Sequence, residues 1–554
     1  MSARRLATLA IPATLCALSA LCPGDPAPAA SPRTLAELLP EGAVTVLEVD
    51  DLRLLLKRWS RSSLHSRFEE SRAAADLRKS RLYLRLAQNV GQLEDVAGFG
   101  ITLDRLGELA GHRSAIALYD LPSTSFVLTM ELSHDEAKRS DLLGQKGRLS
   151  QREHRGLPYL LAEGGHGKAP LAVALVGDRL IAGTDIEAFR GALVLAARAS
   201  GLAVAPLATP DPRPITADTD TAALFADAPR GAPIRMWVAQ RRISNTHYFA
   251  DYWIFDKDSS VGIDQAIVTL APGDEVTTET RIYLYSPGAR PAVGENAIVE
   301  VCHADVVAAT SALPSSPPFV SAHAADAARA AQAIEALLPR GTSDRAADIR
   351  AIAKALQPGD PNRAVEALEP SHPKGGFAEH HGAVAVALGA PGAFDGKTLE
   401  AALAGVVAPR IGGAGSDLSF TNDAGGVRTL KLPLIAEWSL AWKRVGDAIV
   451  LGTDPSSCLR LADALALPQS TKLLASSTPR LFRLDVDRAA GVWHDAVTTL
   501  AARDNWSETG DAEFFQESLG GLFEVARDTR RVVGIGYARG PRRYVEEVQF
   551  RSAK

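Results

Sequence analysis

The chain has 554 residues, of which 46% are hydrophobic and 23% are charged. This composition is typical of a globular protein with material for more than one domain, and it excludes a largely disordered chain and a multi-span membrane protein. The 60 Lys and Arg residues against 65 Asp and Glu give a net charge of −5. That balance disfavours nucleic-acid binding through bulk charge, because neutralising phosphates requires a basic surface.

The N-terminus has the pattern of a secretory signal peptide. Arg4 and Arg5 precede residues 6–22, which carry no charge, and a small-residue, Pro-rich stretch follows. A positive start, an apolar stretch and a small-residue exit direct export, so residues 1–30 are predicted to be a cleaved signal. The alternatives are an uncleaved anchor and lipidation at Cys22. We expect a periplasmic or extracellular protein, or one anchored through its N-terminus, with no later membrane span.

The elements of the first half are predicted from apolar patterns and turn residues. They are a short helix at 34–39, a strand at 44–49, a mostly helical stretch at 52–96, a hairpin at 114–119 and 126–132, and strands at 234–239, 265–270 and 279–285. Consecutive hairpins favour an antiparallel sheet over a doubly wound one.

The second half is expected to repeat this order. Ala-rich helices are predicted around 323–338 and 344–356, and strands near 383–389, 437–442, 448–451, 481–486, 532–538 and 544–551. The predicted fold class is therefore α+β, with two tandem related halves, each a mainly antiparallel sheet with packed helices.

One motif occurs twice and carries the prediction of a repeat. Residues 171–190 and 440–460 both contain Val-Gly-Asp followed, after four residues, by Gly-Thr-Asp. Two weaker correspondences keep the same order: 44–49 resembles 297–301, and 261–263 resembles 533–535. Three matches in one order indicate tandem duplication, with copies at 31–288 and 289–554.

The shared motif predicts architecture rather than catalysis. Its Gly-Asp pair lies between two apolar runs, where Gly accepts the positive φ of a two-residue hairpin turn. Thr184 and Asp185 supply side-chain oxygens for the unpaired N–H groups of a following helix, and Thr184 with Glu187 also fits a capping box. Asp454 followed by Pro455 fits a helix cap with Pro at the first helical position. The motif therefore predicts a strand, a tight turn, a second strand and a capped helix.

Complete local catalytic motifs are missing from the sequence. Gly-x-Ser-x-Gly, His-Glu-x-x-His and Cys-x-x-Cys do not occur. Residues 391–398 resemble a phosphate-binding loop, but Pro391 stands where Gly is needed and has no N–H to offer. We expect an ordinary helix-starting loop there, no cofactor, and a protein that is more readily explained as a non-enzyme.

A histidine cluster is the candidate metal site. Imidazole and carboxylate groups suit zinc, and the candidate ligands are His372, Glu379, His380 and His381. Adjacent residues of a strand point to opposite faces, so His380 and His381 could both bind only from a loop. The alternative is an exposed polar loop.

An aromatic segment is the candidate binding surface. It contains Tyr248, Phe249, Tyr252, Trp253 and Phe255. Aromatic side chains bury large areas in a core and also form ligand or partner surfaces, so both interpretations stay open.

Two cysteines, Cys302 and Cys458, lie outside the signal region. In an oxidising compartment they could form one disulfide. Alternatively, both are buried free thiols that pack as small hydrophobic groups.

The segment at 39–59, LPEGAVTVLEVDDLRLLLKRW, resembles bacterial exported proteins grouped as domain of unknown function 3352. The strand-turn-strand at 171–184 and its second copy are also similar to that group. The resemblance implies export and a repeated α+β build. That group has no assigned activity, so the resemblance implies no functional residues.

These features together predict an exported, non-enzymatic binding or scaffolding protein of the bacterial cell envelope. Its expected partner is an envelope protein or an apolar ligand. The alternatives are an exported hydrolase whose active-site residues are dispersed in sequence and a carrier of apolar ligands.

Overall fold

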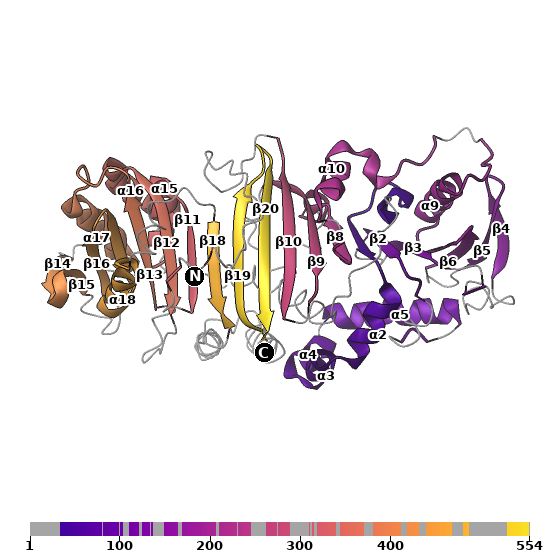
Figure 1. The fold of residues 1–554 in the computed structure, drawn as a ribbon, viewed down its shortest axis with the longest axis horizontal. Helices are drawn as coiled ribbons and strands as arrows, with labels where there is room; N and C mark the ends of the chain where they lie inside the picture. Colours follow the sequence, from indigo (N-terminus) through magenta and orange to yellow (C-terminus); the bar gives the residue numbers. More distant parts are fainter. Residues whose placement is uncertain are drawn as a thin grey trace. The chain divides into compact units, whose positions relative to one another are not determined.

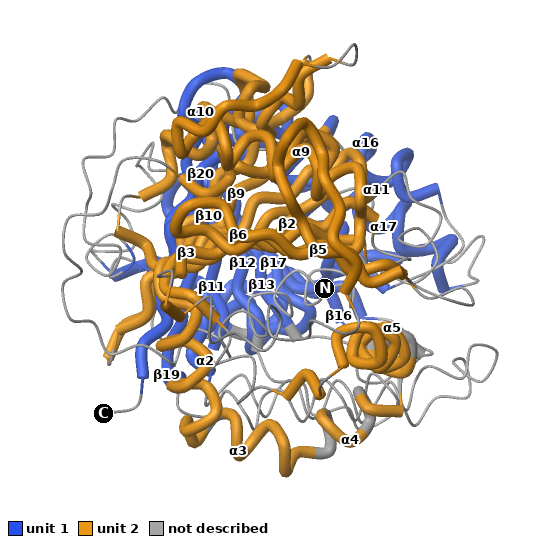
Figure 2. The backbone as a smooth tube through the Cα atoms, turned by 90° about the vertical axis from the view of Figure 1, so that its right-hand side faces the viewer, with its two compact units in different colours: residues 1–12, 290–554 blue, residues 13–289 orange. Residues whose placement is uncertain are grey.

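The computed structural model mixes helices and strands (Figure 1). It describes residues 34–552, with the longest gaps at 137–148, 245–261, 288–309, 370–380, 468–479 and 487–528 and shorter gaps elsewhere. The chain divides into two compact units, which Figure 2 shows in orange and blue. We call Ala13–Ala289 the N-terminal unit and Arg290–Lys554 the C-terminal unit.

The N-terminal unit begins with a 3-10 turn, one strand and four helices, and continues mainly with strands. Its elements are η1 (Leu35–Leu38), β1 (Thr45–Val49), α2 (Leu52–Arg61), α3 (Ser63–Glu70), α4 (Arg72–Lys79), α5 (Arg81–Ala97), β2 (Ser114–Asp120), β3 (Ser125–Glu131), β4 (Ser150–His154), β5 (Leu157–Ala162), β6 (Leu171–Val176), β7 (Arg179–Gly183), α9 (Ile186–Ala199), η2 (Ile215–Ala217), α10 (Thr219–Asp227), β8 (Ile234–Val238), α11 (Gln240–Ser244), β9 (Ile263–Ala271) and β10 (Val276–Tyr285). The strands pair antiparallel in the order β4-β5-β6-β7-β3-β2-β1-β8-β9-β10.

The C-terminal unit has fewer described helices before its second strand. Its elements are β11 (Phe319–Ala324), α15 (Ala327–Glu335), α16 (Arg345–Leu356), η3 (Gln357–Gly359), β12 (Pro361–Glu369), β13 (His381–Leu388), α17 (Gly396–Arg410), β14 (Phe420–Asp423), η4 (Ala424–Gly426), β15 (Val427–Lys431), β16 (Ser439–Val445), β17 (Ala448–Gly452), α18 (Pro455–Leu465), β18 (Arg480–Asp485), β19 (Thr529–Ala538) and β20 (Arg543–Ser552). Its strands pair antiparallel in the order β14-β15-β16-β17-β13-β12-β11-β18-β19-β20. Position by position, this is the strand order of the N-terminal unit.

Helices cover both faces of the sheet in the N-terminal unit, with α9 on one side and α5 on the other (Figure 2). Val96 of α5 packs against Val173 and Leu180. On the opposite face α9 buries Phe189 and Leu193. A sheet that is buried on both faces needs apolar residues at consecutive positions, and the LAVALV run of β6 provides them.

The C-terminal unit has the same layering. Helices α15, α16 and α17 share one core with the sheet, in which Leu403 and Leu451 are buried. Helix α18 covers the other face, where Cys458 packs with Val450. No helix in the described part of the chain combines the length and the hydropathy needed to cross a membrane.

The Gly-Asp pairs form the predicted two-residue turns. Gly177 has a φ of 61° and Gly446 a φ of 55°, values that a residue without Cβ adopts readily. The flanking pairs Val176–Arg179 and Val445–Ala448 close the two hairpins. Both turns are thus explained by backbone geometry.

The helix caps after these hairpins confirm one prediction and correct another. Asp454 caps α18 by accepting a hydrogen bond from the Ser457 N–H, with Pro455 at the first helical position. In the N-terminal unit Asp185, one of the two residues predicted to cap the helix, is the cap and accepts from the Ala188 N–H, whereas the capping box predicted at Thr184 does not form the cap.

The threonine of each Gly-Thr-Asp motif instead joins two strands. The Thr184 hydroxyl accepts a hydrogen bond from the Phe126 N–H of β3 at 3.1 Å. Likewise, the Thr453 hydroxyl accepts from the Gly382 N–H of β13 at 3.0 Å. Each motif therefore fixes a strand end, the adjacent strand and a helix start at one corner.

Two parts of the predicted element order require correction or stay open. Residues 319–324 form β11, so the helix predicted at 323–338 begins only at α15, after its cap Asp326. Residues 297–301, predicted to match the strand at 44–49, lie outside the described residues. In the C-terminal unit the place of β1 in the strand order is taken by β11.

Two short strands have only one neighbour among the described strands. They are β4, which pairs with β5, and β14, which pairs with β15. Four of the five residues of β4 are exposed and its sequence is SQREH. The sequence patterns did not predict either strand, because neither has a run of apolar residues.

Substituting Gly452 tests the close packing at the Gly-Thr-Asp corner of the C-terminal unit. A Cβ at this position would lie 2.6 Å from the Cys458 backbone nitrogen, so Gly452→Ala is expected to lower the free energy of unfolding by about 1–3 kcal/mol. The control is Gly405→Ala, because nothing lies within 4 Å of a Cβ there and Ala stabilises an α-helix by about 0.5–1 kcal/mol relative to Gly. Urea unfolding of both variants measures the difference, and equal effects at the two sites would contradict the close approach.

Candidate functional site

The aromatic binding candidates lie outside the described residues. These are Tyr248, Phe249, Tyr252, Trp253 and Phe255. Their proposed role in binding stays a prediction.

Most of the candidate metal ligands also lie outside the described residues, namely His372, Glu379 and His380. His381 is the first residue of β13, where its backbone pairs with that of Glu369 in β12. Within the described part of the chain, no group of three or more His, Cys, Asp and Glu residues is arranged to hold a metal ion.

Cys458 is a buried free thiol in this structure. Its Sγ lies 3.4 Å from the Val450 carbonyl oxygen. Burial raises the pKa of the thiol to about 12, so the reactive thiolate is scarce at neutral pH. Cys302 lies outside the described residues, and its pairing with Cys458 stays a prediction.

The loop that resembles a phosphate-binding site is used as a helix cap. Asp395 accepts hydrogen bonds from the backbone N–H groups of Lys397 and Thr398, both at 3.2 Å. These are N–H groups of the kind that a bound phosphate would need. The Asp395 carboxylate therefore accepts the hydrogen bonds that a bound phosphate would otherwise accept.

A buried charge cluster in the N-terminal unit brings together residues far apart in sequence. Glu48 lies on β1 between β2 and β8, and its side chain is 1% exposed. Its Oε1 is 2.9 Å from Arg113 Nη2, and its Oε2 is 3.8 Å from Arg235 Nη1. We call Glu48, Arg113 and Arg235, with Asp50 on the same side of β1, the Glu48 cluster.

Two further donors complete the surroundings of Glu48. The Leu35 N–H donates to Oε1 at 3.0 Å, and the Thr34 hydroxyl donates to Oε2. Both carboxylate oxygens therefore accept hydrogen bonds from the start of η1. Because the donors come from three different parts of the chain, the cluster ties the segment at 34–38 to the sheet.

In this cluster Asp50 has a shifted pKa. Burial raises its pKa above the ordinary value, opposed mainly by the nearby Arg235 and reinforced by the Glu48 charge. A carboxyl group with a raised pKa is a candidate proton donor or acceptor. Asp50 lies beside the ion pair of Glu48 and Arg113, which has a structural role.

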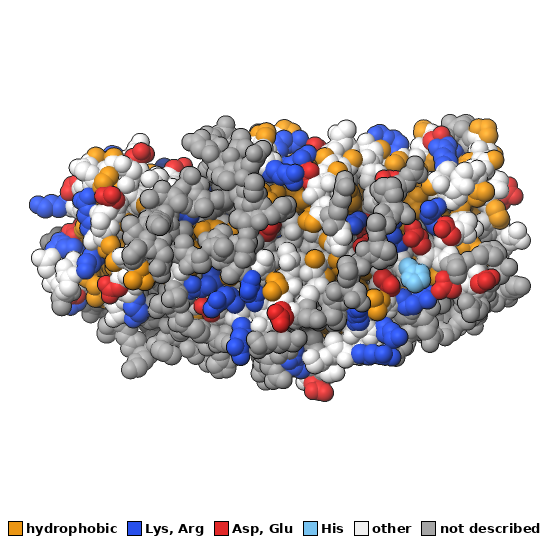
Figure 3. All heavy atoms as spheres, in the orientation of Figure 1, with side chains coloured by type: hydrophobic (Ala, Val, Ile, Leu, Met, Phe, Trp, Pro, Cys, Tyr) orange, Lys and Arg blue, Asp and Glu red, His pale blue; other side chains and the backbone are white. Residues whose placement is uncertain are grey.

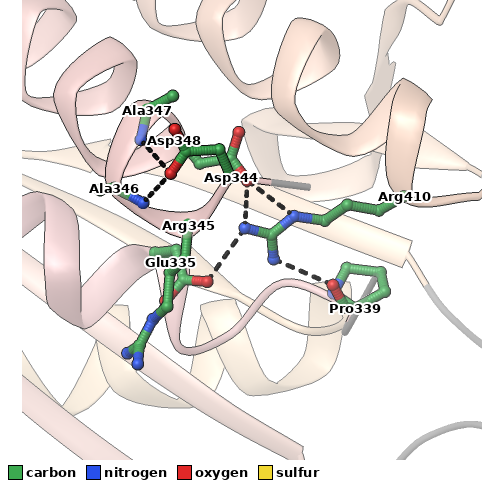
Figure 4. A network of polar contacts seen from close by, with 8 residues as sticks. All are labelled: Glu335, Pro339, Asp344, Arg345, Ala346, Ala347, Asp348 and Arg410. Carbon is green, nitrogen blue, oxygen red and sulfur yellow. Dashed lines mark hydrogen bonds and ion pairs between the residues drawn. The ribbon is translucent and has the colours of Figure 1, made fainter. Parts of the chain in front are cut away.

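A second buried cluster joins three helices in the C-terminal unit (Figure 4). The Arg410 side chain, at the end of α17, is 3% exposed. Its guanidinium donates to Glu335 of α15 at 2.9 Å, to Asp348 of α16 at 2.5 Å, and to the Pro339 carbonyl at 2.9 Å. We call Arg410, Glu335 and Asp348 the Arg410 cluster.

The sequence analysis missed both clusters. Glu48 follows Val46 on the same face of a strand, so a lone acid at an inward-facing position was a signal in the alternating pattern. Arg410 offered no comparable signal, because a basic residue at a helix end is ordinarily explained by the helix dipole. Its two acidic partners are 62 and 75 residues away in sequence.

The comparisons with known proteins assign no family. No family model matches the chain, and no curated protein is significantly similar to it. Crystal forms IV and I of TP0453 match with 10% and 12% identity over 46% and 47% of this chain, and 81% and 82% of theirs, with TM-scores of 0.24 and 0.23. Scores of this size do not show a shared fold. The resemblance to domain of unknown function 3352 stays a prediction.

Replacing Glu48 tests the role of its cluster. Glu48→Gln keeps the shape but leaves Arg113 and Arg235 without the buried charge between them, so the free energy of unfolding is expected to fall by about 3–5 kcal/mol. Glu131→Gln is the control, because Glu131 is 3.9 Å from Arg113 and 33% exposed, and we expect an effect within about 1 kcal/mol. Chemical denaturation measures the unfolding free energy of both variants. If Glu48→Gln is as stable as wild type, the structural role of the Glu48 cluster is refuted.

Replacing Arg410 makes the corresponding test in the C-terminal unit. Arg410→Ala removes the buried guanidinium that the carboxylates of Glu335 and Asp348 share and is expected to cost about 3–5 kcal/mol of unfolding free energy. Arg345→Ala serves as the matched control, since Arg345 bonds the same Glu335 at 2.8 Å but is 55% exposed, and the expected cost is about 1 kcal/mol or less. Similar losses for the two variants, measured by denaturant titration, would show that burial does not decide the effect.

Proposed function

We propose that this protein is an exported, non-enzymatic binding or scaffolding protein of the bacterial cell envelope. The observation that supports this most directly is the use of its buried charged groups. Among the described residues, the side chains of Glu48 and Arg410 each form hydrogen bonds with neighbouring parts of their own unit. Groups engaged in this way hold a fold together and are not free to react.

We further propose that the two units are tandem related copies. Their described strands pair in the same order, and each unit places a Gly-Asp turn and a Gly-Thr-Asp corner at the same point of that order. A shared order of ten strands is hard to reach independently, because many pairings of so many strands are compatible with one antiparallel sheet. Duplication also accounts for the spacing shared by residues 171–190 and 440–460.

The proposed export rests on the N-terminal pattern. A basic pair, an uncharged apolar stretch and a small-residue exit are the features that export machineries recognise. The envelope is therefore the proposed site of action, and a partner from that compartment is the proposed ligand.

One observation favours a second candidate function, an exported hydrolase. Asp50 combines a raised pKa with two neighbouring arginines, Arg113 and Arg235. A proton-transfer group beside cations that stabilise negative charge is a common element of hydrolytic sites. If the protein is an enzyme, Asp50 is the described carboxyl group on which activity would depend.

A turnover assay with wild type and Asp50→Asn separates the two functions. We expect no turnover of ester, peptide, glycoside or phosphoester substrates by either protein. Reproducible turnover that Asp50→Asn abolishes would overturn the non-enzymatic role.

The pH dependence of stability shows whether Asp50→Asn has altered the intended group. Because the native pKa lies above the unfolded one, native Asp50 retains its proton to higher pH, and its contribution to stability falls as pH rises between the two values. Asp50→Asn is therefore expected to lose less unfolding free energy than wild type as pH rises above 3.8, the ordinary pKa of this carboxyl group. An unchanged pH profile would show that Asp50 is not perturbed.

A further inference from the structure

Four consecutive helices, α2–α5, differ in composition from the rest of the chain. They span residues 52–97 and lie together along one side of the sheet of the N-terminal unit (Figure 1). We call them the α2–α5 segment. Helix α2 is anchored to the sheet by Leu55 and Trp59, which pack with Ile234 and Leu270.

This segment holds most of the large hydrophobic side chains that are exposed. The exposed side chains in the described residues are Leu54, Tyr83, Leu84, Val90, Leu202 and Leu467. The first four belong to α2 and α5, and Leu84 is the most exposed at 57%. Scattered exposed apolar residues need no explanation, but a concentration in one segment marks an interaction surface.

The two ends of α5 are used differently. Near its C-terminus, Leu93 and Val96 pack against the core. Near its N-terminus, Tyr83 and Val90 are exposed, and their spacing of seven residues places them on one face of the helix. Ala97, a further seven residues along, is buried in the core, so the exposed apolar stripe continues the core-facing side of α5 toward its N-terminus, where that side is exposed.

The same segment is strongly basic. Residues 52–97 contain ten Lys and Arg against five Asp and Glu, although the whole chain has a net charge of −5. Lys57 and Arg61 of α2 are exposed, as are Arg78 and Lys79 of α4. In the space-filling view, Lys and Arg side chains lie on the surface over α2 (Figure 3).

From this combination we infer that the α2–α5 segment docks on the surface of an anionic lipid bilayer. The inference rests on the proposed binding role and names its partner. Basic residues are attracted to anionic headgroups, and exposed leucine, valine and tyrosine side chains of the same segment enter the boundary between headgroups and acyl chains. The segment lies on the bilayer and does not cross it.

The apolar side chains distinguish a bilayer from a nucleic acid. Both present negative charge to the basic residues. Leucine and valine, however, neither stack on bases nor donate hydrogen bonds to phosphates, whereas transfer from water into acyl chains is favourable for both. Exposed Leu54, Leu84 and Val90 therefore fit a lipid surface.

Vesicle binding by the full chain tests this inference. Because the apolar residues 6–22 would themselves bind a bilayer, the readout must be local, and we choose hydrogen exchange of amides 81–90 together with sedimentation. Vesicles of equal parts phosphatidylglycerol and phosphatidylcholine are expected to protect these amides, and pure phosphatidylcholine is expected not to. The protection should weaken as salt screens the charges.

Two pairs of substitutions make the test specific. Leu84→Ser with Val90→Ser is expected to weaken vesicle-induced protection about tenfold, because about 1.4 kcal/mol of apolar burial is lost. Leu202→Ser with Leu467→Ser is the matched control, since these leucines are 48% and 47% exposed outside the segment, and should change protection less than about twofold. Lys57→Gln with Arg61→Gln should weaken binding to the anionic vesicles.

Three results would overturn the inference. They are equal protection on both kinds of vesicle, no loss on replacing Leu84 and Val90, and a greater protection of 81–90 by duplex DNA than by vesicles. Circular dichroism of each variant shows that the fold is retained. Turnover abolished by Asp50→Asn would overturn the proposed function while leaving these vesicle results unaffected, so the two failures are distinguishable.

Discussion

Each unit depends on how its Gly-Asp hairpin, β6–β7 or β16–β17, is joined to the strand beside it. The strand that ends in Gly-Thr-Asp must pair with an adjacent strand and also release the chain into a helix that folds back over the sheet. Thr184 and Thr453 meet the first requirement by bonding to β3 and β13, and Asp185 and Asp454 meet the second by capping α9 and α18. Because threonine and aspartate perform these two different tasks at consecutive positions, the corner leaves little freedom for substitution.

The buried ion clusters add a constraint of another kind. Removing charges from water costs several kcal/mol for each ion, and attraction to a partner offsets that cost only when the geometry is good. The Glu48 cluster meets this condition by accepting bonds from η1 and from Arg113, the residue before β2, and the Arg410 cluster by joining α15, α16 and α17. Such clusters are therefore better understood as fixing which elements meet than as large sources of stability.

The sequence predicted best those features that local chemistry determines. Glycine in a turn and aspartate before a helix act on their own neighbours, so both hairpins and the cap at Asp454 could be inferred. Strand β12 could not, because PNRAVEALE begins with Pro, is rich in Ala and Glu, and contains Arg363, which the fold buries at 1% exposure. Contacts across 62 or more residues, as at Arg410, depend on topology and leave no local pattern.

The polar strand β4 has a consequence for how the protein behaves at high concentration. A strand with an open side offers unpaired N–H and C=O groups to other molecules, and a long apolar one would template polymerisation. Here the strand is five residues long and its sequence is SQREH, and an edge strand that is short and carries charged side chains disfavours edge-to-edge addition. The polar residues of β4 therefore disfavour fibrous assembly. They are also the reason why the strand lacks the apolar pattern by which a strand is predicted.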